Sequence, residues 1–455
     1  MKIAFLLDQF PRLSETYFLE QIVGLLQAGH DLDIIATIPG GQPKVHPDVE
    51  RFDLLARTHY TGLPADEDAQ LVAAGRLVRA NFLEMPRSLL KLLSLPSYGC
   101  MTVDHFTRVL HGAVLFSRFG DTSYDIIHCH YGPTGLMGAS LRQLGILKGR
   151  IVTTFHGSDA YVYPNKWRVP VYEYLFRNID LCTVSTDYMK NTVLRLGASA
   201  DRVRKLPVGL DLKKFTFQPR EIGADGVIKL ATVARLAEKK GLEYSIRAVA
   251  RVCKSSSVHI QYRIAGEGPM RDQLQGLIDD LGMKNHIELL SWLDQPEVTE
   301  LLADSHIFIL PSVTARDGNK EGQALVIQEA QAMGLPVIAT IHNGVPEGML
   351  DGKSGILVPE RDVAALADAI QFLVSHPESW QEMGLAGRAF VEKNYDIDML
   401  NRRLLGMYEE LMESGPPADS SRHESFGKYT RTLVQGYLRS FKGQKSIGAS
   451  DASAR

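Results

Sequence analysis

Short apolar runs rich in Val and Ile alternate with longer amphipathic stretches along most of this chain. Strands that are buried on both faces read as continuous apolar runs, so this alternation predicts an α/β protein with helix-covered parallel sheets. The predicted strands span 2–8, 31–37, 125–130, 151–155, 180–185, 203–207, 228–233, 258–265, 286–290, 307–310, 336–339 and 355–358. The predicted helices span 14–28, 133–144, 187–196, 241–253, 270–281, 295–304, 323–333 and 363–375.

The alternation restarts near residue 227, after a segment with the composition of a linker. Residues 207–226 contain two prolines and three glycines and show no periodicity. We therefore predict two doubly wound, Rossmann-like domains, 1–207 and 227–395, joined by a linker at 208–226. Open α/β sheets bind ligands beyond the carboxyl ends of their strands, so a site is expected in the cleft between the domains.

Three regions fall outside this alternation. A helical insertion is predicted at 64–120, with helical stretches at 88–95 and 109–116. A further helix is predicted at 396–413, crossing back to the first domain. The tail 414–455 is predicted to be partly disordered. Within it, 424–442 combines apolar residues at helical spacing with basic flanks, which is typical of a helix lying in a membrane headgroup region. Packing against the protein is the alternative for this helix.

Composition excludes several classes of protein. The 455 residues are 45% hydrophobic and 23% charged, as in soluble globular proteins. The 50 basic and 53 acidic residues give a net charge of −3, so nucleic acid is not an expected partner. The four cysteines form no C-x-x-C pair, and no apolar run reaches the length of a membrane span or signal peptide. We expect a cytoplasmic protein, with peripheral contact at the inner membrane left open.

Common cofactor and metal motifs do not match. The segment Gly352-Lys353-Ser354 misses the Walker spacing, and no G-x-G-x-x-G follows the first strand. The pair Asp31 and Asp33 opens a strand, where a solvated strand start is favoured over a metal site. The residues His128 and His130 share a strand face, which favours structural or cleft-lining roles over metal binding. We therefore expect neither a metal nor a cofactor.

The loop and helix that follow the strand at 307–310 are the most informative segment. Glu321 precedes the predicted helix and Glu329 lies within it. First-turn amides of a helix lack intrahelical partners, so those of Gly322, Gln323, Ala324 and Leu325 are suited to bind a diphosphate. A carboxylate beside them would suit sugar or ribose hydroxyls. The alternative is an ordinary helix-terminal charge with a solvated glutamate.

Two further loops of the second domain contain candidate ligand-binding residues. Arg235 and Lys240 follow the strand at 228–233, and two cations there could clamp a diphosphate. Alternatively they are isolated surface charges. Gly266 and Gly268 follow the strand at 258–265 and would allow close approach of the backbone to a ligand.

One loop of the first domain is a candidate for the opposite side of the cleft. His156 and Asp159 follow the strand at 151–155, three residues apart in a predicted tight turn. Both could face the cleft. The alternative is a capping aspartate beside a histidine with satisfied hydrogen bonds.

Together these motifs resemble the retaining family 4 glycosyltransferases of the GT-B fold over residues 1–410. The matching features are two glutamates separated by seven residues, Arg-Leu-x-x-x-Lys-Gly at 235–241, Gly-Glu-Gly-Pro at 266–269 and His-Gly-x-Asp at 156–159. The segments 10–16 and 312–318 resemble the bacterial exopolysaccharide branch, such as the colanic-acid transferases. Two departures are Ala234, where the family commonly has glycine, and Phe10-Pro11-Arg12, where it has a glycine pair.

The resemblance implies metal-independent transfer from a nucleoside-diphosphate sugar to a saccharide or polyprenyl-diphosphate-linked acceptor, with retention by front-face displacement. Carried over by position, Glu321 would contact the donor sugar and Glu329 the ribose. Arg235 and Lys240 would neutralise the leaving diphosphate, and the amides at 322–325 would bind phosphate oxygens. His156 and Asp159 would lie near the transferred sugar and the acceptor. Two alternatives stay open: a sugar-nucleotide epimerase on the same fold, and a catalytically inactive scaffold.

Overall fold

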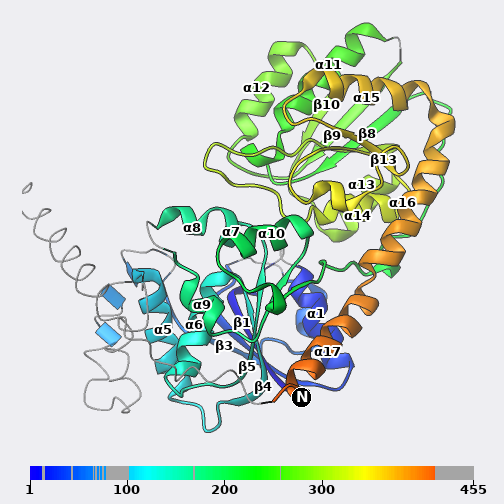
Figure 1. The fold of residues 1–455 in the computed structure, drawn as a ribbon. Helices are drawn as coiled ribbons and strands as arrows, with labels where there is room; N and C mark the ends of the chain where they lie inside the picture. The colour runs from blue at the N-terminus through cyan, green and yellow to red at the C-terminus, as the bar shows by residue number, and fades with distance from the viewer. Residues whose placement is uncertain are drawn as a thin grey trace, which may run out of the picture.

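The chain forms two parallel sheets, each covered by helices on both faces (Figure 1). The computed structural model describes residues 1–12, 16–41, 45–64, 66, 69–70, 72–73, 76–77, 102–167, 170–256 and 258–415. The predicted stretch 88–95 and the predicted tail helix 424–442 lie outside these residues. No helix in the described part is long and apolar enough to cross a membrane.

The first sheet has seven strands in the order β3-β2-β1-β4-β5-β6-β7. Its strands are β1 (Lys2–Phe10), β2 (Asp31–Pro39), β3 (Thr58–Tyr60), β4 (Ser123–His130), β5 (Lys148–Phe155), β6 (Leu181–Val184) and β7 (Val203–Lys205). All neighbouring pairs are parallel. The helices around it are α1 (Thr16–Gln27), α2 (Pro47–Arg51), α5 (Val103–Phe116), α6 (Gly132–Gln143), α7 (Ser158–Tyr161), α8 (Tyr163–Lys166), α9 (Glu173–Arg177) and α10 (Asp187–Arg195).

The second sheet has six parallel strands in the order β10-β9-β8-β11-β12-β13. Its strands are β8 (Ile228–Val233), β9 (Ile260–Ala265), β10 (Ile287–Leu290), β11 (Ile307–Leu310), β12 (Val337–Thr340) and β13 (Gly355–Val358). Its helices are α11 (Leu242–Ser255), α12 (Arg271–Leu281), α13 (Gln295–Ala303), α14 (Leu325–Ala332), α15 (Val363–Ser375) and α16 (Trp380–Tyr395). Short 3₁₀ helices at Ala200–Arg202, Leu212–Lys214, Glu238–Lys240, Val345–Gly348 and Pro377–Ser379 complete the described elements.

The last described helix, α17 (Ile397–Glu413), returns to the first domain. Figure 1 shows α16 and α17 running one after the other along the side of both sheets. The buried face of α17 places Leu400, Leu404 and Tyr408 in the same hydrophobic cluster as Phe5 and Ile22 of the first domain. The chain therefore crosses between the domains a second time.

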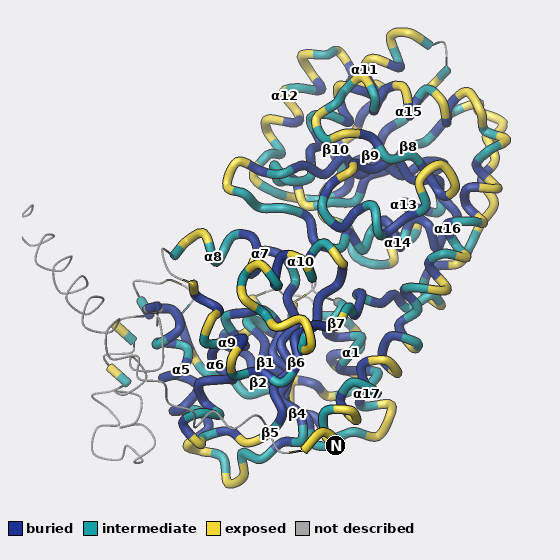
Figure 2. The backbone as a smooth tube through the Cα atoms, viewed as in Figure 1, coloured by how far each residue is buried: buried dark blue, intermediate teal, exposed yellow. Residues whose placement is uncertain are grey.

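Burial follows the pattern that the sequence predicts. Most strands are buried along nearly their whole length, and the outer helix faces are exposed (Figure 2). The edge strands β3, β7 and β10 are less buried. The hydrophobic residues of each sheet divide into a cluster on either face of it. The prediction of an α/β protein with two doubly wound sheets is therefore confirmed.

The sequence missed β3, which is short and only partly buried, so it lacks the apolar run of the other strands. It also placed the start of α14 two residues too early, at 323 rather than Leu325.

Candidate active site

The loops that follow β8, β9 and β11 lie at the carboxyl edge of the second sheet and carry most of the predicted donor-side residues. Glu321, in the β11–α14 loop, is 7% exposed. Its carboxylate contacts the Lys240 ammonium and lies 3.7 Å from that of Lys239. Burial by itself would raise the pKa of Glu321, but the two lysines outweigh it and the pKa falls to about 2. The carboxylate is therefore a buried anion with its counter-ions in place.

The backbone of Glu321 is fixed on both sides. Its amide donates to Nε2 of His342 at 3.0 Å, and its carbonyl accepts from the Asn343 side chain at 2.9 Å. Since Nε2 of His342 accepts, its Nδ1 carries the proton and donates to Glu360 at 2.6 Å. The segment after β12 thus holds Glu321 at the edge of the sheet.

Glu329 lies in the second turn of α14 and is partly exposed. Among the described residues, no group donates a hydrogen bond to its carboxylate or forms an ion pair with it. Burial without a partner raises its pKa to about 7. The two glutamates therefore differ in charge near neutral pH, because only Glu321 has cations beside it.

The start of α14 departs from the predicted anion site. Ala324 is the N-cap, and the Leu325 amide bonds to the Gln323 carbonyl at 3.2 Å, so it is not free for a ligand. The Gln323 side chain pairs with the amide and carbonyl of Val208 at 2.7 and 2.9 Å. The prediction of four available amides was thus wrong for Leu325, and the Gln323 side chain ties α14 to the linker.

The glycines after β9 permit a close approach, but to the neighbouring loop of the protein itself. Gly266 and Gly268 have φ of 143° and 158°. A Cβ at Gly266 would lie 2.0 Å from the carbonyl oxygen of Ala234, and one at Gly268 would lie 2.4 Å from that of Leu236. These glycines therefore set the path of the loop that carries Arg235.

Arg235 is exposed, and within the described residues it has neither an ion pair nor a hydrogen bond through its side chain. Lys240, from the same loop, is instead paired with Glu321. The two cations that the sequence grouped together therefore have different surroundings, since Lys240 already neutralises a carboxylate and Arg235 does not.

On the first domain, Asp159 organises the loop after β5. Its carboxylate accepts from the amides of Gly157, Gly132 and His156 at 2.8, 3.0 and 3.1 Å. Burial raises its pKa to about 6, although the three amides favour the ionised form. Since the residue is only 3% exposed, these contacts favour the capping interpretation over direct contact with a substrate.

His156 is partly exposed and is held by rings on three sides. The ring centroids of Tyr17, Tyr131 and His130 lie 4.6, 4.7 and 5.2 Å from its own. The Tyr17 and Tyr131 hydroxyls are 2.5 Å apart. The alternative of a metal site at His128 and His130 gains no support, because no three His, Cys, Asp or Glu residues cluster suitably among the described residues.

The two sides of the site meet at Gly322 and His156. A Cβ at Gly322 would lie 2.8 Å from the carbonyl oxygen of His156, so only glycine allows this approach without a shift. The 3₁₀ helix at Val345–Gly348 adds a second contact between the domains. Glu347 accepts from the amides of Asp187 and Tyr188 at the start of α10, at 2.8 and 2.9 Å, and pairs with Lys205 at 2.6 Å.

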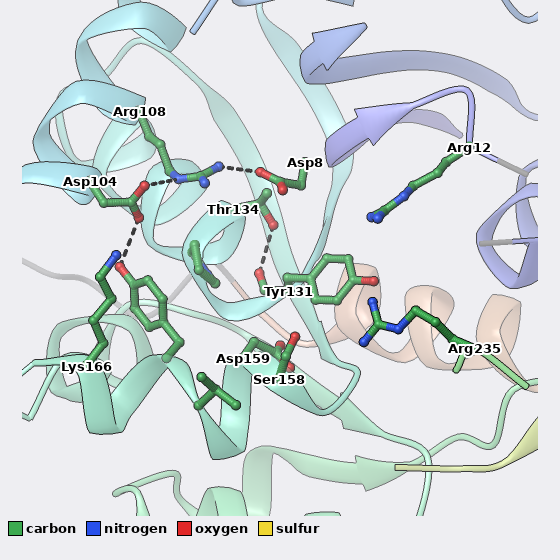
Figure 3. A pocket seen from close by; sticks show the side chains of 13 residues that line it. Asp8, Arg12, Asp104, Arg108, Tyr131, Thr134, Ser158, Asp159, Lys166 and Arg235 are labelled. Atoms are coloured by element: carbon green, nitrogen blue, oxygen red, sulfur yellow. Dashed lines mark hydrogen bonds and ion pairs between the residues drawn. The ribbon is translucent and has the colours of Figure 1, made fainter. Parts of the chain in front are cut away.

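A pocket of about 470 Å³ lies beside this contact, with Arg235 from the second domain at its edge. Figure 3 shows Arg108 between the carboxylates of Asp8 and Asp104, at 2.7 and 2.9 Å, on one wall of the pocket. Arg12 and Arg235 lie on the opposite side, near Tyr131. The remaining polar lining residues are Thr134, Ser158, Asp159, Tyr163 and Lys166. This wall of carboxylates, hydroxyls and guanidinium groups suits a polar ligand rather than an apolar one.

Two family models cover most of the chain, one for each sheet. Residues 14–209 match the glycosyl transferase 4-like domain, and residues 214–390 match glycosyl transferases group 1. The chain is 32% identical over 432 residues to the putative colanic acid biosynthesis glycosyltransferase WcaL of Salmonella typhimurium, covering 90% of this chain and 100% of that protein. The chain belongs to the glycosyltransferases of exopolysaccharide biosynthesis. The amylovoran biosynthesis glycosyltransferase AmsK of Erwinia amylovora is also 32% identical, over 416 residues, with 90% and 100% covered.

Solved structures place this glycosyltransferase in the GT-B fold. Anabaena HepE, in complex with UDP, superposes with a TM-score of 0.66 at 16% identity, over 90% of this chain and 100% of that one. Sucrose-phosphate synthase from Thermosynechococcus elongatus gives 0.67 at 20% identity, over 90% and 99%. The predicted family and fold are therefore confirmed.

Sequence reasoning missed several residues around the site of this glycosyltransferase. Lys239 adjoins Lys240 but belongs to no motif, and neither do His342, in the loop after β12, and Glu347, in the 3₁₀ helix at Val345–Gly348. Tyr17 and Tyr131 come from segments far apart in the chain. For His130, the alternation with His128 on one strand was a usable signal, because it placed both at the carboxyl end of β4.

Proposed function

We propose that this glycosyltransferase moves a sugar from a nucleoside-diphosphate sugar to a saccharide acceptor, with retention and without a metal. The observation that carries the proposal is the meeting of Gly322 with His156. It brings the Glu321 loop of the second domain against the His156 loop of the first. A donor bound at the second sheet would therefore present its sugar to a pocket lined mainly by the first domain.

The charges of the site support a diphosphate leaving group. Arg235 has no partner among the described residues, and Lys240 and Lys239 lie beside Glu321. An ammonium has three donors, so Lys240 can contact Glu321 and a phosphate oxygen together. Fixed cations aimed at developing negative charge are a large source of rate enhancement. HepE, which shares the fold, has been solved with UDP and with UDP-glucose, and this supports a nucleotide-sugar donor.

Glu321 and Glu329 are proposed to hold the donor's hydroxyls. The ionised Glu321 would accept from the transferred sugar, and Glu329 would accept from the ribose. The anomeric configuration would be retained if the acceptor hydroxyl attacks on the face that the diphosphate leaves. The amides of Gly322, Gln323 and Ala324 would then lie near the phosphate.

The test uses the purified full chain and a panel of UDP- and GDP-sugars. Binding of the right donor raises the thermal denaturation temperature in proportion to affinity and concentration. Transfer to a saccharide acceptor after EDTA treatment, with an α-linked product from an α-linked donor by NMR, is the expected result. An inverted linkage or an absolute need for Mn²⁺ or Mg²⁺ would contradict the proposal. Incubating the enzyme with the donor alone distinguishes a transferase from an epimerase, because only an epimerase would isomerise the sugar without an acceptor.

We propose further that the acceptor is polyprenyl-diphosphate-linked and is met at the cytoplasmic face of the inner membrane. The exopolysaccharide names of the relatives support this, as do the basic and apolar residues of 424–442. A variant ending at Ser414 should keep its thermal denaturation temperature and lose affinity for anionic liposomes. Equal sedimentation of the full chain and this variant with such liposomes would contradict a role of the tail.

A further inference from the structure

Three histidines from two neighbouring strands form a continuous stack behind the candidate active site. His128 and His130 lie on β4, and His156 directly follows β5. The ring centroids of His128 and His130 are 4.4 Å apart, and those of His130 and His156 are 5.2 Å apart with an interplanar angle of 12°. His130 is fully buried, so it joins the partly exposed His156 to the interior of the domain.

The environment of His130 determines which of the two rings donates the hydrogen bond between His130 and His156. Nδ1 of His130 lies 3.0 Å from Nε2 of His156, so one of the two nitrogens must donate. Nε2 of His130 is buried and has no hydrogen-bond partner in the described part of the protein. A buried N–H without an acceptor is rarer in proteins than an unfilled acceptor. The proton of His130 is therefore placed on Nδ1, which donates to His156.

Both rings carry a single proton near neutral pH. Burial lowers the pKa of His156 to about 3, and it lowers that of His130 well below its ordinary value. A neutral imidazole that accepts at Nε2 has its proton on Nδ1. Nδ1 of His156 bonds to no described residue and is not among the fully buried atoms.

The far end of the stack is anchored. Nδ1 of His128 lies 2.6 Å from the Tyr408 hydroxyl of α17, and its Nε2 lies 2.6 Å from the hydroxyl of Thr154. Both nitrogens are thereby engaged, and the ring cannot turn without breaking a buried hydrogen bond. His130 packs against this fixed ring and against Phe5, whose ring centroid is 5.2 Å from that of His130 and 5.0 Å from that of His128.

We propose that His130 is a positioning residue that holds His156 in its Nδ1-protonated tautomer. His156 then offers the cleft a fixed hydrogen-bond donor and not a base. Its acceptor would be an oxygen of the bound sugar or of the diphosphate. The identity of that oxygen rests on the proposed function, whereas the tautomer does not.

The first test reads the tautomer directly in the full-length enzyme. Histidine side chains are labelled with ¹⁵N, and long-range ¹H–¹⁵N spectra at pH 7 distinguish protonated from unprotonated ring nitrogens. His156 is assigned by the signals lost in His156→Gln. A protonated Nδ1 on His156 is expected, and a protonated Nε2 would overturn the proposal. This result stands even if no tested sugar nucleotide is a donor.

The second test replaces His130. His130→Asn retains an amide donor near the position of Nδ1, whereas His130→Leu retains none. We expect His130→Leu to give mixed His156 tautomers and a fall in kcat of about tenfold or more, with a smaller change in the donor KM. His130→Asn should restore the single tautomer and most of kcat. An unchanged tautomer in the leucine variant, or equal loss of kcat in both variants, would overturn the proposal.

His105→Leu is the matched control for loss of a buried histidine in the same domain. His105 is 4% exposed and bonds to Ser140 at 2.8 Å, not to His156. Its replacement should lower the denaturation temperature and leave the His156 tautomer unchanged. If His130→Leu does not fold, the spectra of the wild type and of His130→Asn still show whether His156 is in the proposed tautomer.

Discussion

The Lys240 ammonium contacts the Glu321 carboxylate and so joins the loops after β8 and β11 at the carboxyl edge of the second sheet. Both side chains are nearly buried, with exposed fractions of 13% and 9%. Removing one member of a buried pair leaves the other charge uncompensated, which is more costly than losing a surface contact. Substitutions here are therefore expected to lower stability, besides any effect on the proposed reaction.

Glu321→Gln keeps the size of the side chain and removes its charge. We expect kcat to fall at least about 100-fold if the carboxylate contacts the transferred sugar. The variant should also be less stable near neutral pH. Because the pKa of Glu321 is about 2 in the fold, against 4.5 ordinarily, its ionised form stabilises the fold above pH 4.5 and this contribution is lost as the pH falls toward 2.

Denaturation followed by circular dichroism between pH 2 and 7 checks the stability part of this prediction. The difference in unfolding free energy between wild type and Glu321→Gln should shrink as the pH falls below 4.5. Glu300→Gln, at an exposed position on α13, is the control. A difference that is constant with pH would show that the charge of Glu321 does not stabilise the fold.

Glu329→Gln should have the opposite pH dependence. Burial raises the pKa of Glu329 to about 7, so the fold favours its protonated form and loses stability as the pH rises from 4.5 through 7. The glutamine variant lacks this loss and should gain stability relative to wild type as the pH rises through that window. Its affinity for the donor nucleotide, measured by calorimetry, should fall about tenfold. Unchanged affinity would argue against contact with the ribose.

The Arg235→Ala and Lys240→Ala variants should lose similar amounts of activity, but only one of them should lose stability. Each should lower kcat/KM about 100-fold, because each removes a cation from the proposed diphosphate site. Only Lys240→Ala should lower the denaturation temperature, since it leaves Glu321 without its nearest counter-ion. Arg247→Ala, on the exposed face of α11, is the control. Wild-type turnover in Arg235→Ala would remove Arg235 from the site.

Glu347→Gln tests the contact between the domains. The carboxylate caps α10 of the first domain and pairs with Lys205, so its neutralisation should cost about 1–2 kcal/mol of stability. We expect a larger radius of gyration by small-angle scattering and faster proteolysis in the linker. Glu392→Gln, which removes an ion pair with Arg388 within α16, is the control. Identical scattering for wild type and Glu347→Gln would show that this contact does not hold the domains together.

The two sheets, and the loops that carry the candidate residues, are predictable from the order of apolar and polar residues. Apolar periodicity located β8, β11 and β13 at their observed bounds, because a strand buried on both faces admits few polar residues. The topology of parallel sheets then places the residues after each strand at one edge. This is why Glu321, Arg235 and His156 could be assigned to a cleft from the sequence.

What those side chains contact depends on the packing of loops that are distant in the chain. The pairing of Lys240 with Glu321, the bond from the Gly132 amide to Asp159 and the bond from His130 to His156 join residues from different loops. The resulting pKa of about 2 for Glu321 and about 7 for Glu329 depends on burial and neighbouring charge. Neither the contacts nor the pKa values follow from the spacing of two glutamates along the chain, because the same spacing fits a solvated pair.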